Sequence, residues 1–259
     1  MSQHDDESSA PKRGGLPVVD QASPPDADRA FLEAPREIST PEFLDALFAD
    51  NREEVAKLIV QDDRLVKSRD GSGSTAILLA VYHGLDEMLG VLLRSEVELD
   101  LFEAAAVGDA GRVGALIAED PQGLVAASGD GFPALTLACH FGHEEAAGVL
   151  LDAGASVTRP AENPSRVQPI HASLAHRGDG ALVGRLVARL LAAGADVEAE
   201  QAGGFRPLHQ AAGRGDVALV RQLLDAGAES APEADLGQTP HSLATEREHA
   251  DVVAFFDSL

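Results

Sequence analysis

A repeat of about 33 residues runs through most of this chain and limits what it can fold into. Seven equivalent turn positions are separated by 34, 24, 34, 36, 37 and 33 residues. A fixed period of this length is typical of solenoids, in which small supersecondary units stack side by side. The short second interval predicts a unit whose connecting loop has been almost removed. The marker positions are Asp50, Gly84, Gly108, Gly142, Gly178, Gly215 and Glu248.

Apolar residues keep a constant register with these markers. In five units they stand 5, 8 and 9 residues after the marker, as in Val55, Leu58 and Ile59. The spacing i, i+3, i+4 forms one stripe of an amphipathic α-helix. After Gly178 the pattern is displaced by four residues, about one helical turn, which predicts a longer helix there. We expect one member of each stripe to line a common interior seam, for example Leu92, Leu116, Leu150 and Leu223.

A second, shorter helix rich in alanine precedes each marker, as in residues 76–82 and 135–141. The longer helices end where a glycine follows the last leucine, as at Gly154 and Gly227. Glycine tolerates the left-handed conformation that closes a helix. Each unit is therefore predicted to be helix, tight turn, helix and loop. No single unit can bury its apolar stripe, so the units must stack.

The motifs of these units resemble those of ankyrin repeats, which open with Thr-Pro-Leu-His-x-Ala and close with Gly-Ala-Asp-Val. The best copy runs from Gly204-Phe-Arg-Pro-Leu-His209 to a closing Asp-Ala-Gly-Ala228. The resemblance implies an all-α ankyrin-repeat solenoid of about seven stacked helix-turn-helix units over residues 39–259. It also implies a structural role for His171 and His209, which tie their turns to neighbouring backbone. The approximate units are 40–69, 70–98, 99–127, 128–160, 165–201, 202–234 and 235–259.

Residues 1–38 contain five prolines and show no apolar periodicity. Such a segment buries too little apolar surface to offset its ordering entropy, so it is predicted to be a disordered acidic and proline-rich tail. Phe31-Leu32 is a candidate for a short partner-binding motif within it. Helical order is expected to begin with Thr40 as the N-cap and Pro41 as the first helical residue.

Composition excludes several classes of protein. Asp and Glu outnumber Lys and Arg by 43 to 20, which gives a net charge of −23, and the chain has one cysteine. The acidic balance argues against nucleic acid and against anionic membranes, because binding there depends on neutralising phosphates. One cysteine excludes an internal disulfide and a Cys-rich zinc site. Without a secretory signal or a long apolar run, we expect a cytoplasmic, monomeric protein with no membrane partner.

No catalytic or cofactor pattern stands out in the sequence. There is no P-loop and no nucleophile elbow, and adjacent carboxylates are expected on solvated helix faces. We therefore predict no catalytic residue, no cofactor and no metal ion. One alternative is an enzyme with a small site in the enlarged fifth unit, where Glu162 and Asp179 would transfer protons. Another is a purely structural spacer.

Imidazole, aromatic and guanidinium side chains recur one or two residues before the markers. In ankyrin repeats these positions face the concave groove, so the resemblance implies a binding stripe there. Such side chains are enriched at interaction hot spots. Plain polar helix ends and a histidine metal site are the alternative interpretations. Two phenylalanines extend the stripe toward the loops, and the loop 159–168 is a further candidate contact. The predicted partner-binding residues are Tyr82, His83, Phe132, His140, Phe141, His176, Arg177, Phe205, Arg214 and Arg247.

These observations together predict a non-catalytic protein–protein interaction module. It would act as a scaffold, adaptor or inhibitor and bind a protein partner in its concave groove. A neutral-to-positive groove on an acidic body would steer an acidic or phosphorylated segment to this place.

Overall fold

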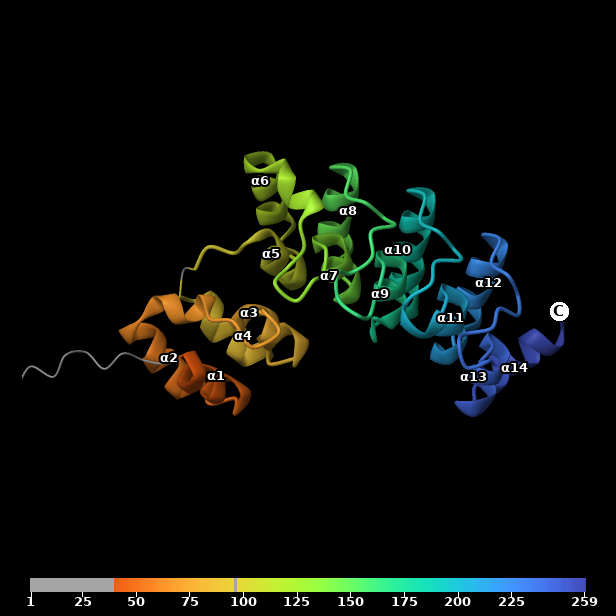
Figure 1. Ribbon diagram of the computed structural model, residues 1–259, viewed down its shortest axis with the longest axis horizontal. Coiled ribbons are helices and arrows are strands. Elements are labelled where there is room, and N and C mark those ends of the chain that lie inside the picture. Colours follow the sequence, from red (N-terminus) through yellow and green to blue (C-terminus); the bar gives the residue numbers. More distant parts are fainter. Residues whose placement is uncertain (1–39, 96) are drawn as a thin grey trace, which may run out of the picture. The chain divides into compact units, whose positions relative to one another are not determined.

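The computed structural model describes residues 40–95 and 97–259, so the predicted tail lies outside the described residues. Within these ranges the chain folds into seven helix pairs that follow one another in a row (Figure 1). The described residues form no β-strand, and their only strand-like feature is an isolated bridge between Arg69 and Thr75. The prediction of an all-α chain is confirmed.

The two helices of each pair form two layers. The first helices are α1 (Thr40–Phe48), α3 (Ala76–Tyr82), α5 (Leu101–Val107), α7 (Ala134–His140), α9 (Pro169–Ala175), α11 (Pro207–Arg214) and α13 (Pro240–Glu246). The second are α2 (Arg52–Gln61), α4 (Asp86–Leu93), α6 (Ala110–Glu119), α8 (Glu144–Asp152), α10 (Gly180–Ala192), α12 (Val217–Asp225) and α14 (Ala250–Asp257). Short 3-10 helices lie in three connections: η1 (Asp63–Lys67), η2 (Pro121–Val125) and η3 (Ala202–Gly204).

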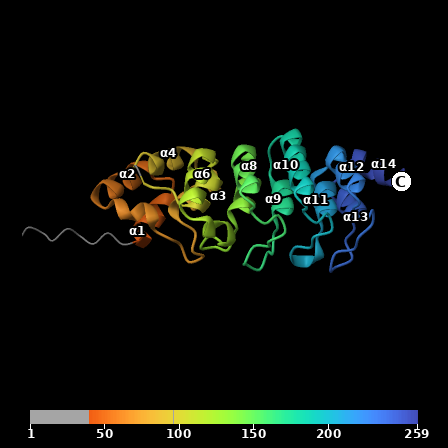
Figure 2. The ribbon, with the colours of Figure 1, turned by 90° about the horizontal axis from the view of Figure 1, so that it is seen from above.

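Each first helix packs on the first helices of the neighbouring units, from α1 on α3 through to α11 on α13. The loops of the later units project together to one side of the helices (Figure 2). Helix α1 includes Thr40, so the helix begins one residue earlier than Pro41, the predicted first helical residue. A shift of this size is common at helix ends, where the first turn frays.

The marker residues occupy the tight turns between the two helices of a unit. Backbone φ is positive at six of the seven markers, from +49° at Asp50 to +82° at Gly108. Gly178 is the exception, because α9 ends at Ala175 and His176 is extended, with φ −61° and ψ 127°. Asp179 then caps α10, whose 13 residues confirm the predicted longer helix.

The interior is divided into two clusters of buried side chains. Leu92 packs with the residues of the first two units, while Leu150 and Leu223 are buried in the cluster of the later units and Leu116 is half-buried against it. The expected single seam is therefore wrong for Leu92. The connection after α4 is too short to hold an outer hairpin, and the layer of second helices is interrupted between α4 and α6, while the first helices α3 and α5 still pack together. Leu93, nine residues after Gly84 and so part of the same predicted apolar stripe, is 39% exposed.

The missing hairpin of the third unit brings the second and fourth units into contact. The Oγ of Ser74 donates a hydrogen bond to Oδ2 of Asp130 at 3.0 Å, and the Tyr82 hydroxyl donates to the same oxygen at 2.7 Å. A Cβ added at Gly73 would lie only 2.6 Å from the carbonyl oxygen of Gly129. The two turns pack backbone to backbone, which places Tyr82 beside the loop of the fourth unit.

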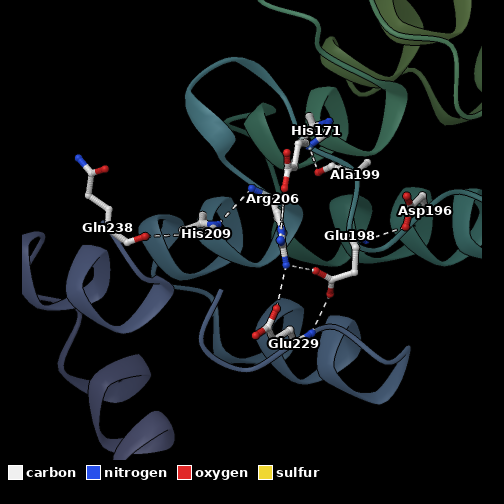
Figure 3. Close-up of polar contacts among 9 residues, drawn as sticks. His171, Asp196, Glu198, Ala199, Arg206, His209, Glu229 and Gln238 are labelled. Atoms are coloured by element: carbon white, nitrogen blue, oxygen red, sulfur yellow. Dashed lines mark hydrogen bonds and ion pairs between the residues drawn. The ribbon is translucent and has the colours of Figure 1, made fainter. Parts of the chain in front are cut away.

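The histidines of the repeat motif cap the short helices from their third position. The main-chain N–H of Gln168 donates to Nδ1 of His171 at 3.3 Å, and Nε2 lies 2.9 Å from the carbonyl oxygen of Ala199. His209 makes equivalent bonds to Arg206 and Gln238 (Figure 3). Both bonds of such a ring are satisfied only when it is neutral with its hydrogen on Nε2, because Nδ1 must accept.

We expect His171 to stay neutral well below the pH at which an exposed histidine protonates. Burial lowers the pKa of His171 to about 4. The unfolded chain therefore takes up the proton more readily, so this stabilisation is complete above about pH 6.5 and is lost as the pH falls toward 4. The expected loss at pH 5 is about 2 kcal/mol. An NMR titration of the ring tests this, and protonation near pH 6.5 would contradict it.

Candidate partner-binding groove

Two adjoining pockets lie along the short helices of the later units. The first, here called the apolar pocket, has a volume of about 180 Å³. The second, the arginine pocket, has a volume of about 480 Å³. They are neighbours because Ala175 and Gln210 line both of them. Together they form one groove that crosses several units.

Seven of the ten predicted site residues line this groove. Tyr82, Phe132 and His140 line the apolar pocket. The arginine pocket is lined by the other four, which are Arg177, Phe205, Arg214 and Arg247. The loop 159–168, predicted as a further contact, supplies Ser165 and Val167 to the wall of the apolar pocket. The fold therefore places along one groove residues that the sequence pattern had grouped, although they are up to 165 positions apart, from 82 to 247.

Aromatic rings gather at one end of the groove. The ring centroid of Phe141 lies 5.7 Å from that of Tyr82 and 4.8 Å from that of His140. Burial and the neighbouring Asp130 carboxylate raise the pKa of the Tyr82 hydroxyl, so it stays protonated and donates to Asp130. The His140 ring has an exposed edge, yet loss of water around it, together with nearby His176, lowers its pKa. This end of the groove is therefore neutral and mostly apolar.

Three predicted site residues line neither pocket. His83 packs edge-on against Phe48, with centroids 5.5 Å apart. The Nδ1 atom of His176 lies 3.0 Å from the carbonyl oxygen of His140, so this ring joins the fourth and fifth units. Phe141 packs against the other aromatics as described above.

In residues 40–95 and 97–259, no three His, Cys, Asp or Glu side chains are grouped as a metal ion would require.

Guanidinium groups form the opposite end of the groove. Arg214 donates to the carbonyl oxygens of His176 and Gly178, and Arg247 donates to that of Gly213 at 2.8 Å. Within the described part of the chain, no carboxylate lies within 4 Å of these two guanidinium groups or of Arg177. Carbonyl oxygens fix a guanidinium group without neutralising it, so the positive charge remains available.

Arg206, outside the groove lining, shows the contrasting arrangement. Its guanidinium contacts Glu198 at 2.7 Å and Glu229 at 2.9 Å (Figure 3), and Glu200 at 3.2 Å. These carboxylates compensate its charge and tie the loops of two units together. In a chain with net charge −23, three arginines without a carboxylate partner thus line one pocket.

Two polar residues of the pocket walls were not predicted from the sequence. Thr136 occupies the third position of α7, where the fifth and sixth units carry histidine, and it is 1% exposed. Its hydroxyl has no hydrogen-bond partner. The cause lies in Pro133, the N-cap of α7, because proline has no N–H for a capping side chain to accept. The buried oxygen of the Gln210 side chain is also unpartnered. A proline before this helix was the signal that could have revealed Thr136.

The two acidic residues of the enzymatic alternative have local structural partners. Glu162 forms an ion pair with Arg159 at the surface. Asp179 accepts a hydrogen bond from the main-chain N–H of Ala181 at 3.0 Å, as the cap of α10. Neither residue lines the groove.

Comparison with known proteins places the repeats in a family. The family model described as ankyrin repeat matches residues 130–161 and 203–234. Tyrosine-protein kinase HTK16 of Hydra vulgaris is 33% identical over 142 residues, which cover 53% of this chain and 17% of that protein. The transient receptor potential cation channel subfamily A member 1 homolog of Caenorhabditis elegans is 28% identical over 211 residues, 77% of this chain and 17% of the channel. The B-cell lymphoma 3 protein homolog of Mus musculus is 29% identical over 200 residues, 77% of this chain and 39% of that protein.

Helix hairpins stacked in a row, with a groove along their short helices, define a helical repeat protein. The chain contains ankyrin repeats, which the family model matches at residues 130–161 and 203–234. Ankyrin repeats are generally protein–protein interaction modules and are typically not enzymes. The chain spans 17–39% of the length of the three relatives above. No helix among the described residues is both long enough and apolar enough to cross a bilayer.

Proposed function

We propose that this chain is a non-catalytic module that holds a protein partner in the groove formed by the apolar and arginine pockets. Acting as a scaffold, adaptor or inhibitor, it would recognise the partner by contacts from several successive units. The predicted residues Tyr82, Phe132, His140, Arg177, Phe205, Arg214 and Arg247 would make direct contacts. His83, Phe141 and His176 would contribute by supporting the groove wall.

The observation that carries this proposal is the adjacency of the two pockets. Aromatic and arginine side chains are the groups most often found at binding hot spots. Here they come from different units and meet on one continuous surface. A charged pocket next to an apolar pocket is suited to an extended segment of protein, because such a segment presents both kinds of side chain along its length.

Site-specific photocrosslinking tests the proposal without assuming what the partner is. A benzophenone amino acid placed at position 175, on the shared wall of the two pockets, is expected to crosslink discrete proteins from a cell lysate. The same amino acid at position 218, an exposed alanine of α12, serves as the matched control. We expect crosslinked bands at position 175 to exceed those at position 218 by about tenfold, in line with a specific site. Equal labelling at both positions would favour the structural spacer.

A further inference from the structure

We infer that the groove recognises an acidic peptide segment in which a bulky apolar side chain stands about three residues from an aspartate or glutamate. The apolar side chain would enter the apolar pocket, and the carboxylate would bind in the arginine pocket. This inference deepens the proposed function and rests on it. It adds the chemistry of the partner, which repeat architecture alone does not define.

The apolar pocket has the size and lining for one large side chain. A cavity of about 150 Å³ holds a benzene ring, and this pocket measures about 180 Å³. Its walls include Phe132, Leu137 and Val167. Thr136, which is almost completely buried, is also among the lining residues.

The arginine pocket selects the charge of the partner. Its lining contains Arg177, Arg214 and Arg247 and no acidic residue. Two of these guanidinium groups are held in place by carbonyl oxygens, so they are oriented before binding. Guanidinium groups form strong, charge-assisted hydrogen bonds with carboxylates. The strongly acidic remainder of the chain repels anions elsewhere, which confines acidic segments to this pocket.

The distance between the pockets sets the spacing of the two recognised side chains. The pockets lie over neighbouring helices of the stack and share Ala175 and Gln210. Packed helices have axes about 8–10 Å apart. An extended peptide advances about 3.3 Å per residue, so about three residues cover this distance.

Peptide selection on the full chain tests the inference. A library of random 12-residue peptides displayed on phage is selected against the intact protein, and the recovered peptides are synthesised with a fluorophore for affinity measurements. We expect enrichment of Phe, Leu, Met or Trp two to four residues from Asp or Glu. Replacing the bulky residue by Ala, or the acid by its amide, should each weaken binding by about tenfold.

Variants of the protein test which pocket binds the apolar side chain of the peptide and which binds its acidic side chain. Val167→Trp fills the apolar pocket, and Val125→Trp, at a position 66% exposed and outside it, is the matched control. Arg177→Glu reverses one charge in the arginine pocket, and Arg94→Glu, at another exposed arginine, makes the same change in net charge elsewhere. We expect each groove variant to weaken the selected peptides by about tenfold and each control by less than about twofold.

The outcomes separate this inference from the proposed function. Selected peptides without an acid, or equal effects of Arg177→Glu and Arg94→Glu, would overturn the inference even if position 175 crosslinks partners. Peptides that bind only after a phosphoserine replaces the acid would overturn the assignment to Asp or Glu. Failure of crosslinking at position 175 would instead remove the proposed function. Competition by a synthetic peptide of residues 26–38 stronger than by any selected peptide would assign the groove to the chain's own segment and overturn the inference.

Discussion

Replacing Lys67 by methionine is expected to lower the free energy of unfolding by about 3 kcal/mol. The Glu103 side chain is 0% exposed, and its Oε2 accepts hydrogen bonds from Nζ of Lys67 at 2.8 Å and from the main-chain N–H of Asp100 at 2.9 Å. The other carboxylate oxygen has no partner. Methionine keeps most of the apolar stem of lysine but removes the ammonium group, so a buried anion remains without its cation. Urea unfolding of the full chain, followed by circular dichroism, measures the effect.

Two further variants show whether the buried charge is the cause. Lys57→Met removes an exposed pair with Glu54 and should change stability by less than about 0.5 kcal/mol. Adding Glu103→Gln to Lys67→Met should recover part of the lost stability, because a neutral amide can still accept from Asp100. If Lys67→Met unfolds at the same urea concentration as the parent protein, the pair is not needed to hold Glu103.

The second large effect is expected for Gly73→Ala, which should cost about 3 kcal/mol of stability. Gly73 has a φ of +91°, which disfavours any residue with a Cβ, and that Cβ would lie 2.6 Å from the carbonyl oxygen of Gly129. The atom it meets belongs to the backbone, so it cannot move aside as a flexible side chain would. The turns of the second and fourth units would have to separate. Thermal or urea unfolding of the variant measures the cost.

Gly71→Ala is the matched control for this substitution. Gly71 lies in the same turn, its φ is not positive, and an added Cβ would meet nothing within 4 Å. The control should leave stability unchanged or raise it by up to about 1 kcal/mol, because alanine restricts the unfolded chain. Equal destabilisation by both substitutions would contradict the proposed contact between the two turns.

Features of the fold that depend on local periodicity could be predicted from the sequence. The register of Val55, Val113 and Val220 with their markers gave the buried side of each long helix, because helical spacing is a property of neighbouring residues. The left-handed turn at Gly108 and the longer α10 were predictable for the same reason. Leu93 was placed inside by that logic but is 39% exposed, because its burial depends on a neighbouring unit that does not close over it.

The candidate groove was predictable as a set of positions but not as a shape. The repeat register placed Phe132, Arg177 and Arg247 on one face, and they do line one groove. It did not reveal the unpartnered Thr136, whose state depends on a proline three residues earlier. Nor did it reveal that the guanidinium groups of Arg214 and Arg247 are held by carbonyl oxygens rather than by carboxylates.

The sequence by itself determined that this chain consists of helix hairpins which must stack, because each hairpin carries an apolar stripe that only a neighbour can cover. Tertiary structure alone decided which units meet around the shortened third unit. The Tyr82–Asp130 bond joins residues 48 positions apart, and the Lys67–Glu103 pair joins residues 36 positions apart. Such contacts arise from packing over long sequence separations, where loop length and side-chain volume, rather than local periodicity, determine which atoms come together.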